Sequence, residues 1–173
     1  KKDLNVLRMG SVIDKKLPTS ISRKIIDYST SYRTEFLDIY LLSKCKFCVA
    51  AGTGLWWIAS AFNRPIVATD TYNIFIHPAL RKYDLMLPIK LKEKKTKHLL
   101  SLREISGFKS YDLKSILDAN DLEFVHNTPV EICEIVEEMN DRLDGKWIQD
   151  WNDDDLQKQF NSLLSKYRSE AHL

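Results

Sequence analysis

The chain has 173 residues, of which 44% are hydrophobic and 29% are charged, which suits one globular core of ordinary size. A formal charge of only +2 argues against an overall field for nucleic acid, and we expect no such partner. No window approaches the ~18 consecutive apolar residues of a membrane span and no leader-like segment opens the chain, so a cytoplasmic domain is expected.

The first half of the chain alternates between strand-like and helix-like patterns. An apolar alternation begins at Leu4, without an initiator methionine, and we expect that a preceding N-terminal domain is missing. Strands are predicted over 3–9, 24–28, 46–50 and 66–69, and helices over 34–43 and 54–62. Short apolar runs separated by helices are typical of a parallel sheet with right-handed crossovers, covered on both faces.

The helix predicted over 34–43 has two distinct faces. Its apolar residues share one face, namely Phe36, Leu37, Tyr40 and Leu41. Glu35 and Asp38 share another, where they either bind ribose hydroxyls or form the solvated side of the helix.

The second half carries weaker patterns until its last two helices. Residues 70–97 are predicted to be mostly loop with an extended piece at 85–91, followed by helices over 97–105 and 113–119 and a strand over 122–125. Thr128, Pro129 and Glu131 predict a helix start with a capping box, and the helix should end near Gly145. A final amphipathic helix is predicted from Asp153 onward.

The turn Ala51-Gly52-Thr53-Gly54 is the strongest candidate site. It follows the predicted strand 46–50, and ligands of parallel sheets bind beyond the carboxyl ends of strands. Glycines let a ligand approach the backbone, and the next helix offers unpaired N–H donors, an arrangement that favours a phosphate or diphosphate. The alternative is a tight turn capped by Thr53. Trp56 and Trp57 point about 100° apart on that helix, so we expect one of them to pack inward.

Other strand ends supply further candidates. Arg8 and Gly10 follow the first strand, where the guanidinium either clamps a diphosphate or forms an ion pair with an acidic residue. Asp70 and Tyr72 follow the strand 66–69. The lysine-rich run 90–97 is interpreted as a solvated loop, with a patch for anionic lipid or phosphate as the alternative.

The cysteines and histidines indicate no metal or nucleophile. The chain has three cysteines, Cys45, Cys48 and Cys133, and this odd number indicates a reducing compartment. Cys48 lies in an apolar run, so it is interpreted as a buried thiol rather than as half of a zinc site or redox pair. His77, His98, His126 and His172 show no metal spacing and no nucleophile beside them, so no metal site is predicted.

Several blocks of sequence resemble a family of bacterial glycosyltransferases found in surface-polysaccharide gene neighbourhoods. The blocks are Leu7-Arg8-Met9-Gly10-Ser11, Ile26-Asp27-Tyr28, Glu35-Phe36-Leu37-Asp38-Ile39-Tyr40-Leu41, Cys45-Lys46-Phe47 and Asn127-Thr128-Pro129-Val130-Glu131-Ile132. The resemblance implies the C-terminal, donor-binding half of a GT-B glycosyltransferase. Residues 1–173 would then form one Rossmann-like α/β domain, with a core over 1–145, helices on both faces of a parallel sheet, and a helical extension over 146–173.

The resemblance also implies a function. Such enzymes bind a nucleotide-sugar donor, need no further cofactor, and act on a saccharide or lipid-linked saccharide, in some cases at the inner face of the membrane. Arg8, Gly10, Gly52, Thr53 and Gly54 match positions where related domains hold the diphosphate. The hinge departs from the Ser-Gly of many relatives, which leaves the hydroxyl's role open. The catalytic base is expected in the missing half, so the chain alone should be inactive. A UDP-sugar epimerase on the same scaffold and a non-catalytic partner-binding module are the alternatives.

Overall fold

A computed structural model describes residues 4–18, 22–52, 54–71, 81–108 and 113–170. The chain is a mixed α/β protein with parallel strand pairs, as the alternating pattern predicted. It divides into two compact units, each described here by itself. The first unit comprises Lys1–Cys48 and Thr53–Pro65, and the second comprises Val49–Gly52 and Ile66–Leu173.

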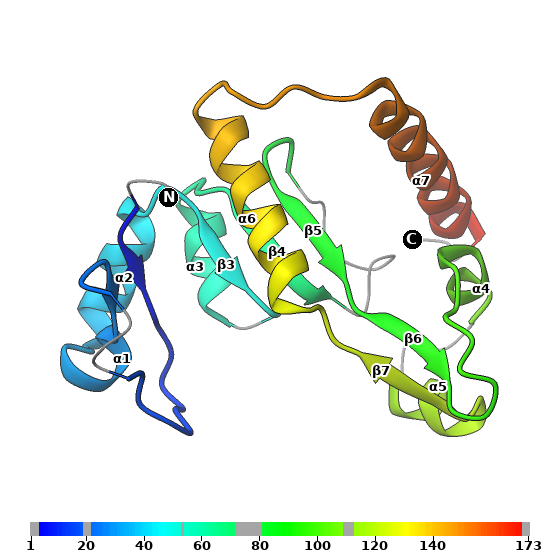
Figure 1. The fold of residues 1–173 in the computed structure, drawn as a ribbon, viewed down its shortest axis with the longest axis horizontal. Helices are drawn as coiled ribbons and strands as arrows, with labels where there is room; N and C mark the ends of the chain where they lie inside the picture. The colour runs from blue at the N-terminus through cyan, green and yellow to red at the C-terminus, as the bar shows by residue number, and fades with distance from the viewer. Residues whose placement is uncertain (1–3, 19–21, 53, 72–80, 109–112, 171–173) are drawn as a thin grey trace. The chain divides into compact units, whose positions relative to one another are not determined.

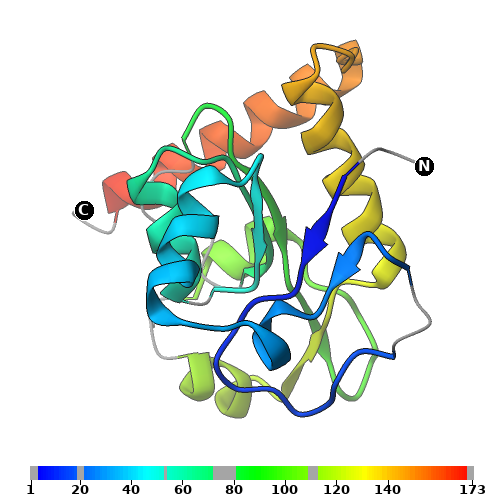
Figure 2. The same cartoon turned by 90° about the vertical axis from the view of Figure 1, so that its left-hand side faces the viewer.

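The first unit joins two short strands to three helices. Strands β1 (Val6–Leu7) and β2 (Ile25–Ile26) run parallel side by side (Figure 2). Helices α1 (Tyr28–Ser31), α2 (Glu35–Lys44) and α3 (Gly54–Ala61) follow, and α2 packs against α3. The strands predicted over 3–9 and 24–28 were thus too long. The second ends before Tyr28, which is buried and opens helix α1. The buried apolar residues of this unit are Tyr28, Leu42, Trp56 and Ala59.

Helix α2 exposes two of its aromatic residues and buries an aspartate. Thr34 caps the helix by accepting a hydrogen bond from the Leu37 N–H at 3.1 Å. Phe36 and Tyr40 are exposed and stack on each other at 6.1 Å, whereas Asp38 and Leu42 are buried. Asp38 therefore does not lie on a solvated side of the helix, which was one of the two alternatives for it, because its hydrogen bond to the buried Tyr28 holds it inward.

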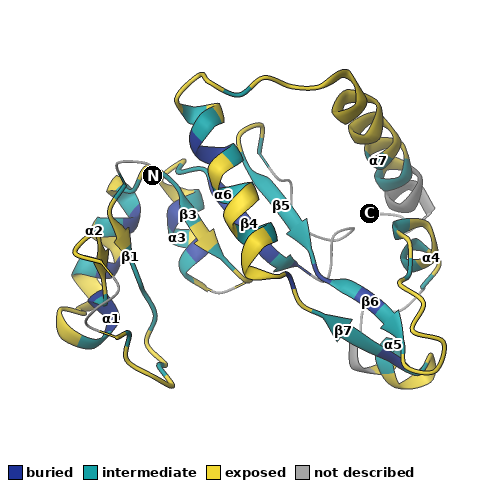
Figure 3. Cartoon of the chain, in the orientation of Figure 1, coloured by how far each residue is buried: buried dark blue, intermediate teal, exposed yellow. Residues whose placement is uncertain are grey.

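The second unit is built around a parallel strand pair. Strands β4 (Ile66–Thr71) and β5 (Leu85–Pro88) are parallel, and β3 (Cys48–Ala50), most of which belongs to this unit, completes a sheet of order β3-β4-β5. Strand β4 is buried along most of its length, as its continuous apolar run predicted. Figure 3 shows buried segments both in β4 and in helix α6 (Pro129–Leu143).

The described strands form three sheets instead of the single parallel sheet that was predicted. Strand β6 (Lys90–Glu93) pairs with β7 (Leu122–Val125) in antiparallel register, with Leu91 opposite Phe124. The region 85–93 thus contains two strands instead of one extended piece in a loop. Helix α4 (Leu102–Ser106) is shorter than predicted, because Lys97 has a positive φ and Ser101 caps the helix.

Helix α6 (Pro129–Leu143) covers the parallel pair, packing against β4 and β5 (Figure 1). Its start confirms the predicted capping box: Thr128 Oγ1 accepts from the Glu131 N–H at 3.2 Å, and Glu131 Oε2 accepts from the Thr128 N–H at 2.8 Å. Met139 is completely buried. Helices α5 (Leu113–Ala119) and α7 (Trp151–Glu170) complete the unit, and most of α7 is exposed (Figure 3).

The capping box should make stability depend on acid pH. The hydrogen bond from the Lys90 ammonium, followed by the bond from the Thr128 N–H, lowers the pKa of Glu131 from 4.5 to about 2. A carboxyl with a lowered pKa stabilises the fold above pH 4.5, and this contribution disappears as the pH falls toward 2.

We therefore expect Glu131→Gln to lower the free energy of unfolding at pH 7 and to flatten its decline between pH 4.5 and 2. Urea unfolding followed by circular dichroism across this pH range measures both effects. Glu134→Gln, at an exposed position of the same helix, is the matched control. An unchanged slope in Glu131→Gln would show that the capping box does not couple to protons.

Candidate functional site

The glycine turn after β3 leaves its backbone open. Gly52 has φ +66°, in the left-handed region that favours glycine, and a Cβ added at Gly52 or Gly54 would meet no atom within 4 Å. Helix α3 begins at Gly54 and runs for 8 residues, so its first N–H groups lack partners within the helix. Thr53 lies outside the described residues. The described part of the turn therefore has room beside its glycines for a ligand to approach.

One of the two tryptophans of α3 is buried and the other is exposed, as the helical spacing predicted. Trp56 is buried, whereas Trp57 is 54% exposed, and the two rings meet edge to face with centroids 5.7 Å apart. Trp56 fixes the helix to the core of the first unit. The turn is consequently joined to a firmly packed helix.

Of the two alternatives for Arg8, a diphosphate clamp or an ion pair with an acidic residue, the structure shows the ion pair. Its Nε lies 3.0 Å from Asp27 Oδ1, and its Nη1 donates to the Lys15 carbonyl at 2.8 Å. Ser29 Oγ also donates to Asp27 Oδ1, at 2.9 Å. The Leu17 N–H bond, followed by side-chain hydrogen bonds and the Arg8 charge, lowers the pKa of Asp27. Only Nη2 of Arg8 is buried without a hydrogen bond to the described residues, so most of its donors hold the protein itself together.

Gly10 also belongs to the first unit and has φ +135°, a conformation that side chains rarely adopt. A Cβ there would meet no atom within 4 Å. The backbone after β1 is thus open at Gly10, although the guanidinium of Arg8 is already engaged.

Asp38 and Glu35 have different surroundings instead of forming a pair. Asp38 is buried, and its carboxylate lies 3.0 Å from both the Tyr28 hydroxyl and Arg33 Nη2. Glu35 is exposed. Burial first, then the neighbouring Asp38, raises the pKa of Tyr28. Asp38 therefore supports the fold of the first unit.

Asp70 ends the regular part of β4 with a left-handed bend at φ +47°, where the register with β5 shifts. Its N–H donates to Asn127 Oδ1 at 2.7 Å, and its Oδ1 accepts from the Asn127 N–H at 2.8 Å. Asn127 Nδ2 also donates to the Pro88 carbonyl at 2.9 Å. The other carboxylate oxygen, Oδ2, lies 3.1 Å from His126 Nδ1. Tyr72, predicted beside Asp70, lies outside the described residues.

Sequence reasoning missed His126 and Asn127 as neighbours of Asp70. His126 has no distinctive spacing, and Asn127 was noticed only as the residue before a helix cap. The available signal was positional: both residues follow the strand 122–125, as Asp70 follows the strand 66–69. Pairing between these two strand ends could not be read from the chain.

The lysine-rich run is neutralised by carboxylates. Lys92 and Lys97 lie 3.0 and 3.4 Å from Glu123, Lys90 pairs with Glu131, and Asp121 lies near two further lysines. Such pairs at the surface contribute little stability but reduce the local positive field. The arrangement does not favour the alternative of an anionic-lipid patch.

Cys48 and Cys45 are partly buried, and burial is the main cause that raises the pKa of both thiols, to about 11 for Cys48. A raised pKa disfavours the reactive thiolate. The structure thus favours the structural interpretation of Cys48.

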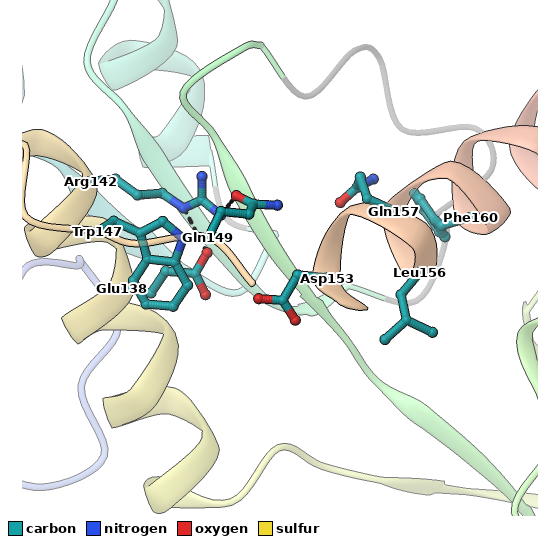
Figure 4. Close-up of a pocket in the computed structure, with 8 residues that line it drawn as sticks. All are labelled: Glu138, Arg142, Trp147, Gln149, Asp153, Leu156, Gln157 and Phe160. Carbon is teal, nitrogen blue, oxygen red and sulfur yellow. Dashed lines mark hydrogen bonds and ion pairs between the residues drawn. The ribbon is translucent and has the colours of Figure 1, made fainter. Parts of the chain in front are cut away.

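A groove of about 390 Å³ lies in the second unit where α6 ends and α7 begins (Figure 4). Arg142 lines one end of it, with Nε 2.7 Å from Glu138 Oε1 and its guanidinium 5.1 Å from the centre of the Trp147 ring. The remaining lining residues are Gln149, Asp153, Leu156, Gln157 and Phe160. None of the residues predicted for the site lines this groove.

Among the described residues, no group of three or more histidine, cysteine, aspartate or glutamate side chains is placed to hold a metal ion. No helix in the described part of the chain is long and apolar enough to cross a membrane. Comparison with protein-family models, curated proteins and solved structures finds no match for this chain.

The Tyr28 hydroxyl should be a measurable source of stability. It lies 3.0 Å from Asp38 Oδ1 and 3.1 Å from the Thr34 carbonyl, and it accepts from the Thr34 N–H at 3.2 Å. We expect Tyr28→Phe to lower the free energy of unfolding by about 1–3 kcal/mol, because buried partners lose their hydrogen bonds. Denaturant unfolding measures the loss. Tyr32→Phe, at a position 64% exposed, is the control, and an equal effect of both substitutions would contradict this role.

Proposed function

We propose that this chain binds the nucleotide-diphosphate sugar donor of a glycosyltransferase that assembles cell-surface polysaccharide. The observation that carries the proposal is the open turn at Gly52 and Gly54, which joins a sheet strand to the start of α3. Backbone N–H groups at a helix start attract anions, both as hydrogen-bond donors and through the positive end of the helix dipole. A diphosphate has the charge and the acceptor oxygens that such a start binds.

The proposal includes the finer fold, a Rossmann-like domain equivalent to the C-terminal half of a GT-B enzyme. Two features support it: the parallel pair β4 and β5 under helix α6, and the position of β3 beside β4. Cys48 N donates to the Pro65 carbonyl at 2.9 Å, so β3 and β4 begin side by side. A strand followed by a helix and by a neighbouring strand of the same direction is the unit from which such domains are built.

The side chains predicted for the site contribute unequally to this proposal. Arg8 and Asp38 already hold partners within the first unit, and Glu35 is exposed. We therefore assign the diphosphate mainly to main-chain N–H groups after Gly52. Thr53 keeps its proposed role as a hydroxyl donor to the same anion.

The proposed chemistry is transfer of the sugar to an acceptor hydroxyl. The bond between the anomeric carbon and the diphosphate oxygen breaks as the acceptor oxygen bonds to that carbon. Negative charge grows on the departing diphosphate, and preorganised N–H donors stabilise it more than they stabilise the bound donor. The acceptor is a saccharide or a lipid-linked saccharide.

Crowding the helix start tests the proposal. A Cβ at Gly54 meets no atom within 4 Å, so Gly54→Val should fold while its methyl groups occupy the approach to the N–H groups. We expect its affinity for UDP, GDP or ADP to fall at least ~10-fold, the loss of one charge-assisted contact, with little change for the nucleosides. Titration calorimetry measures both.

Ala61→Val is the matched control, because it places the same residue, valine, at the exposed far end of the same helix. It should bind nucleoside diphosphates as the unmodified chain does. If the unmodified chain binds none of the diphosphates, the proposed function is wrong. Equal losses for nucleosides and diphosphates in Gly54→Val would point to misfolding instead.

A further inference from the structure

The segment between α6 and α7 turns back onto the end of α6. Gly145 has φ +67°, in the left-handed region that favours glycine, and its N–H donates to the Arg142 carbonyl at 3.2 Å. The N–H groups of Lys146 and Trp147 both donate to the Asp141 carbonyl, at 2.8 and 3.1 Å. These bonds hold the backbone of Trp147 beside the last turn of α6.

A series of polar contacts then joins the end of α6 to the start of α7. Arg142 Nε donates to Glu138 Oε1 at 2.7 Å, and its Nη2 donates to Gln149 Oε1 at 3.1 Å. Gln149 Nε2 donates in turn to Asp154 Oδ1 at 3.0 Å. The Arg142 guanidinium also lies 5.1 Å from the centre of the Trp147 ring. These partners hold Arg142 in place and fix the α6 side of the groove described above.

Helix α7 forms the opposite wall of the groove, across from Arg142 and Trp147 (Figure 4). Within the described part of the chain, the Asp153 side chain has no hydrogen bond or ion pair, so its carboxylate oxygens can accept from a ligand. The side chains of α7 that line the groove are Asp153, Leu156, Gln157 and Phe160.

The indole N–H of Trp147 lacks an acceptor. Nε1 can only donate, and it is buried with no hydrogen bond to the described residues. Almost all buried polar atoms of native proteins have a partner, so an unsatisfied donor in the wall of a groove points to a ligand. Because side-chain rotations on binding are common, a ligand oxygen can supply the missing acceptor.

The charges of the groove disfavour an anionic ligand. The described lining residues include two carboxylates, Glu138 and Asp153, but only one base, Arg142. Glu138 already lies against the Arg142 guanidinium. An added phosphate or carboxylate would therefore meet more negative than positive charge.

The lining also disfavours a purely apolar ligand, because Glu138, Arg142, Gln149, Asp153 and Gln157 are polar. A sugar ring matches the mixture. Its C–H groups form apolar faces that pack on aromatic rings, and its hydroxyls both donate to carboxylates and accept from amide and indole N–H groups. The volume of about 390 Å³ lies within the range of small-molecule sites.

We propose that the groove between α6 and α7 binds a neutral saccharide. Asp153 accepts from its hydroxyls, the indole N–H of Trp147 donates to one of its oxygens, and Trp147 and Phe160 supply the apolar contacts. The groove lies wholly within the second unit, whereas helix α3, which would hold the donor diphosphate, begins in the first. Saccharide binding therefore stands or falls independently of the proposed function.

Titration of the 15N-labelled chain with neutral sugars tests the inference. The probes are the methyl glycosides of glucose, galactose, mannose and N-acetylglucosamine, together with lactose and cellobiose. We expect the indole N–H signal of Trp147, assigned with Trp147→Phe, to shift and saturate with at least one of them. The indole signals of Trp56 and Trp57, in the first unit, are the internal references and should stay in place.

Asp153→Ala removes a proposed contact without breaking a bond to the described residues. We expect it to weaken binding of the same sugar at least ~10-fold, the loss of a hydrogen bond to a charged group. Asp155→Ala is the matched control. It makes the same change of charge two positions along α7, where the carboxylate accepts from Gln159 at 2.8 Å and does not line the groove. It should bind the sugar as the unmodified chain does.

Three results would overturn the inference. The first is that no probe shifts the Trp147 signal at tens of millimolar. The second is equal binding by Asp153→Ala and Asp155→Ala. The third is tighter binding of the 6-phosphate of the same sugar, which would indicate an anion site instead. None of these results alters the expectation for diphosphate binding by Gly54→Val, so the two proposals fail separately.

Discussion

The exchange of hydrogen bonds between Asp70 and Asn127 is the constraint on which the second unit depends. It ends β4 at a left-handed bend, and through Pro88 it joins the end of β5 to the start of α6. Buried polar groups stabilise a fold only when all of them find partners. Here Asn127 bonds both to Asp70 and to the Pro88 carbonyl, so each bond helps to hold the side chain in place for the other. These hydrogen bonds fix where β4 and β5 end and where α6 begins, and they place His126, which precedes Asn127, beside Asp70.

The first unit uses its polar residues in a comparable way. Asp27 holds Arg8, and Asp38 holds Tyr28 and Arg33, so the charged groups that looked available for a ligand stabilise local turns. What remains open is the backbone at the glycines. An anion site made of main-chain N–H groups has a physical advantage, because its donors need no side-chain ordering when the ligand arrives.

The sequence predicted those elements whose signals are local. The cap at Thr128, the proline after it, the buried run of β4 and the opposed Trp56 and Trp57 each follow from neighbouring residues. Partners distant in sequence were not predictable. The burial of Asp38 depends on its bond to Tyr28, ten residues away, and the lysines of β6 meet their carboxylate partners only through the register with β7. The Asp70 cluster joins residues 57 positions apart, so no local pattern could reveal it.

If main-chain N–H groups at the glycine turn bind a diphosphate, as we propose, their NMR signals must respond to it. The most direct measurement is a two-dimensional 15N–1H spectrum of the labelled chain, titrated with UDP, GDP and ADP and, separately, with the nucleosides. We expect the Gly52 and Gly54 signals to shift strongly with at least one diphosphate and hardly at all with its nucleoside. Signals that stay in place at millimolar diphosphate, or that respond equally to the nucleoside, would contradict it.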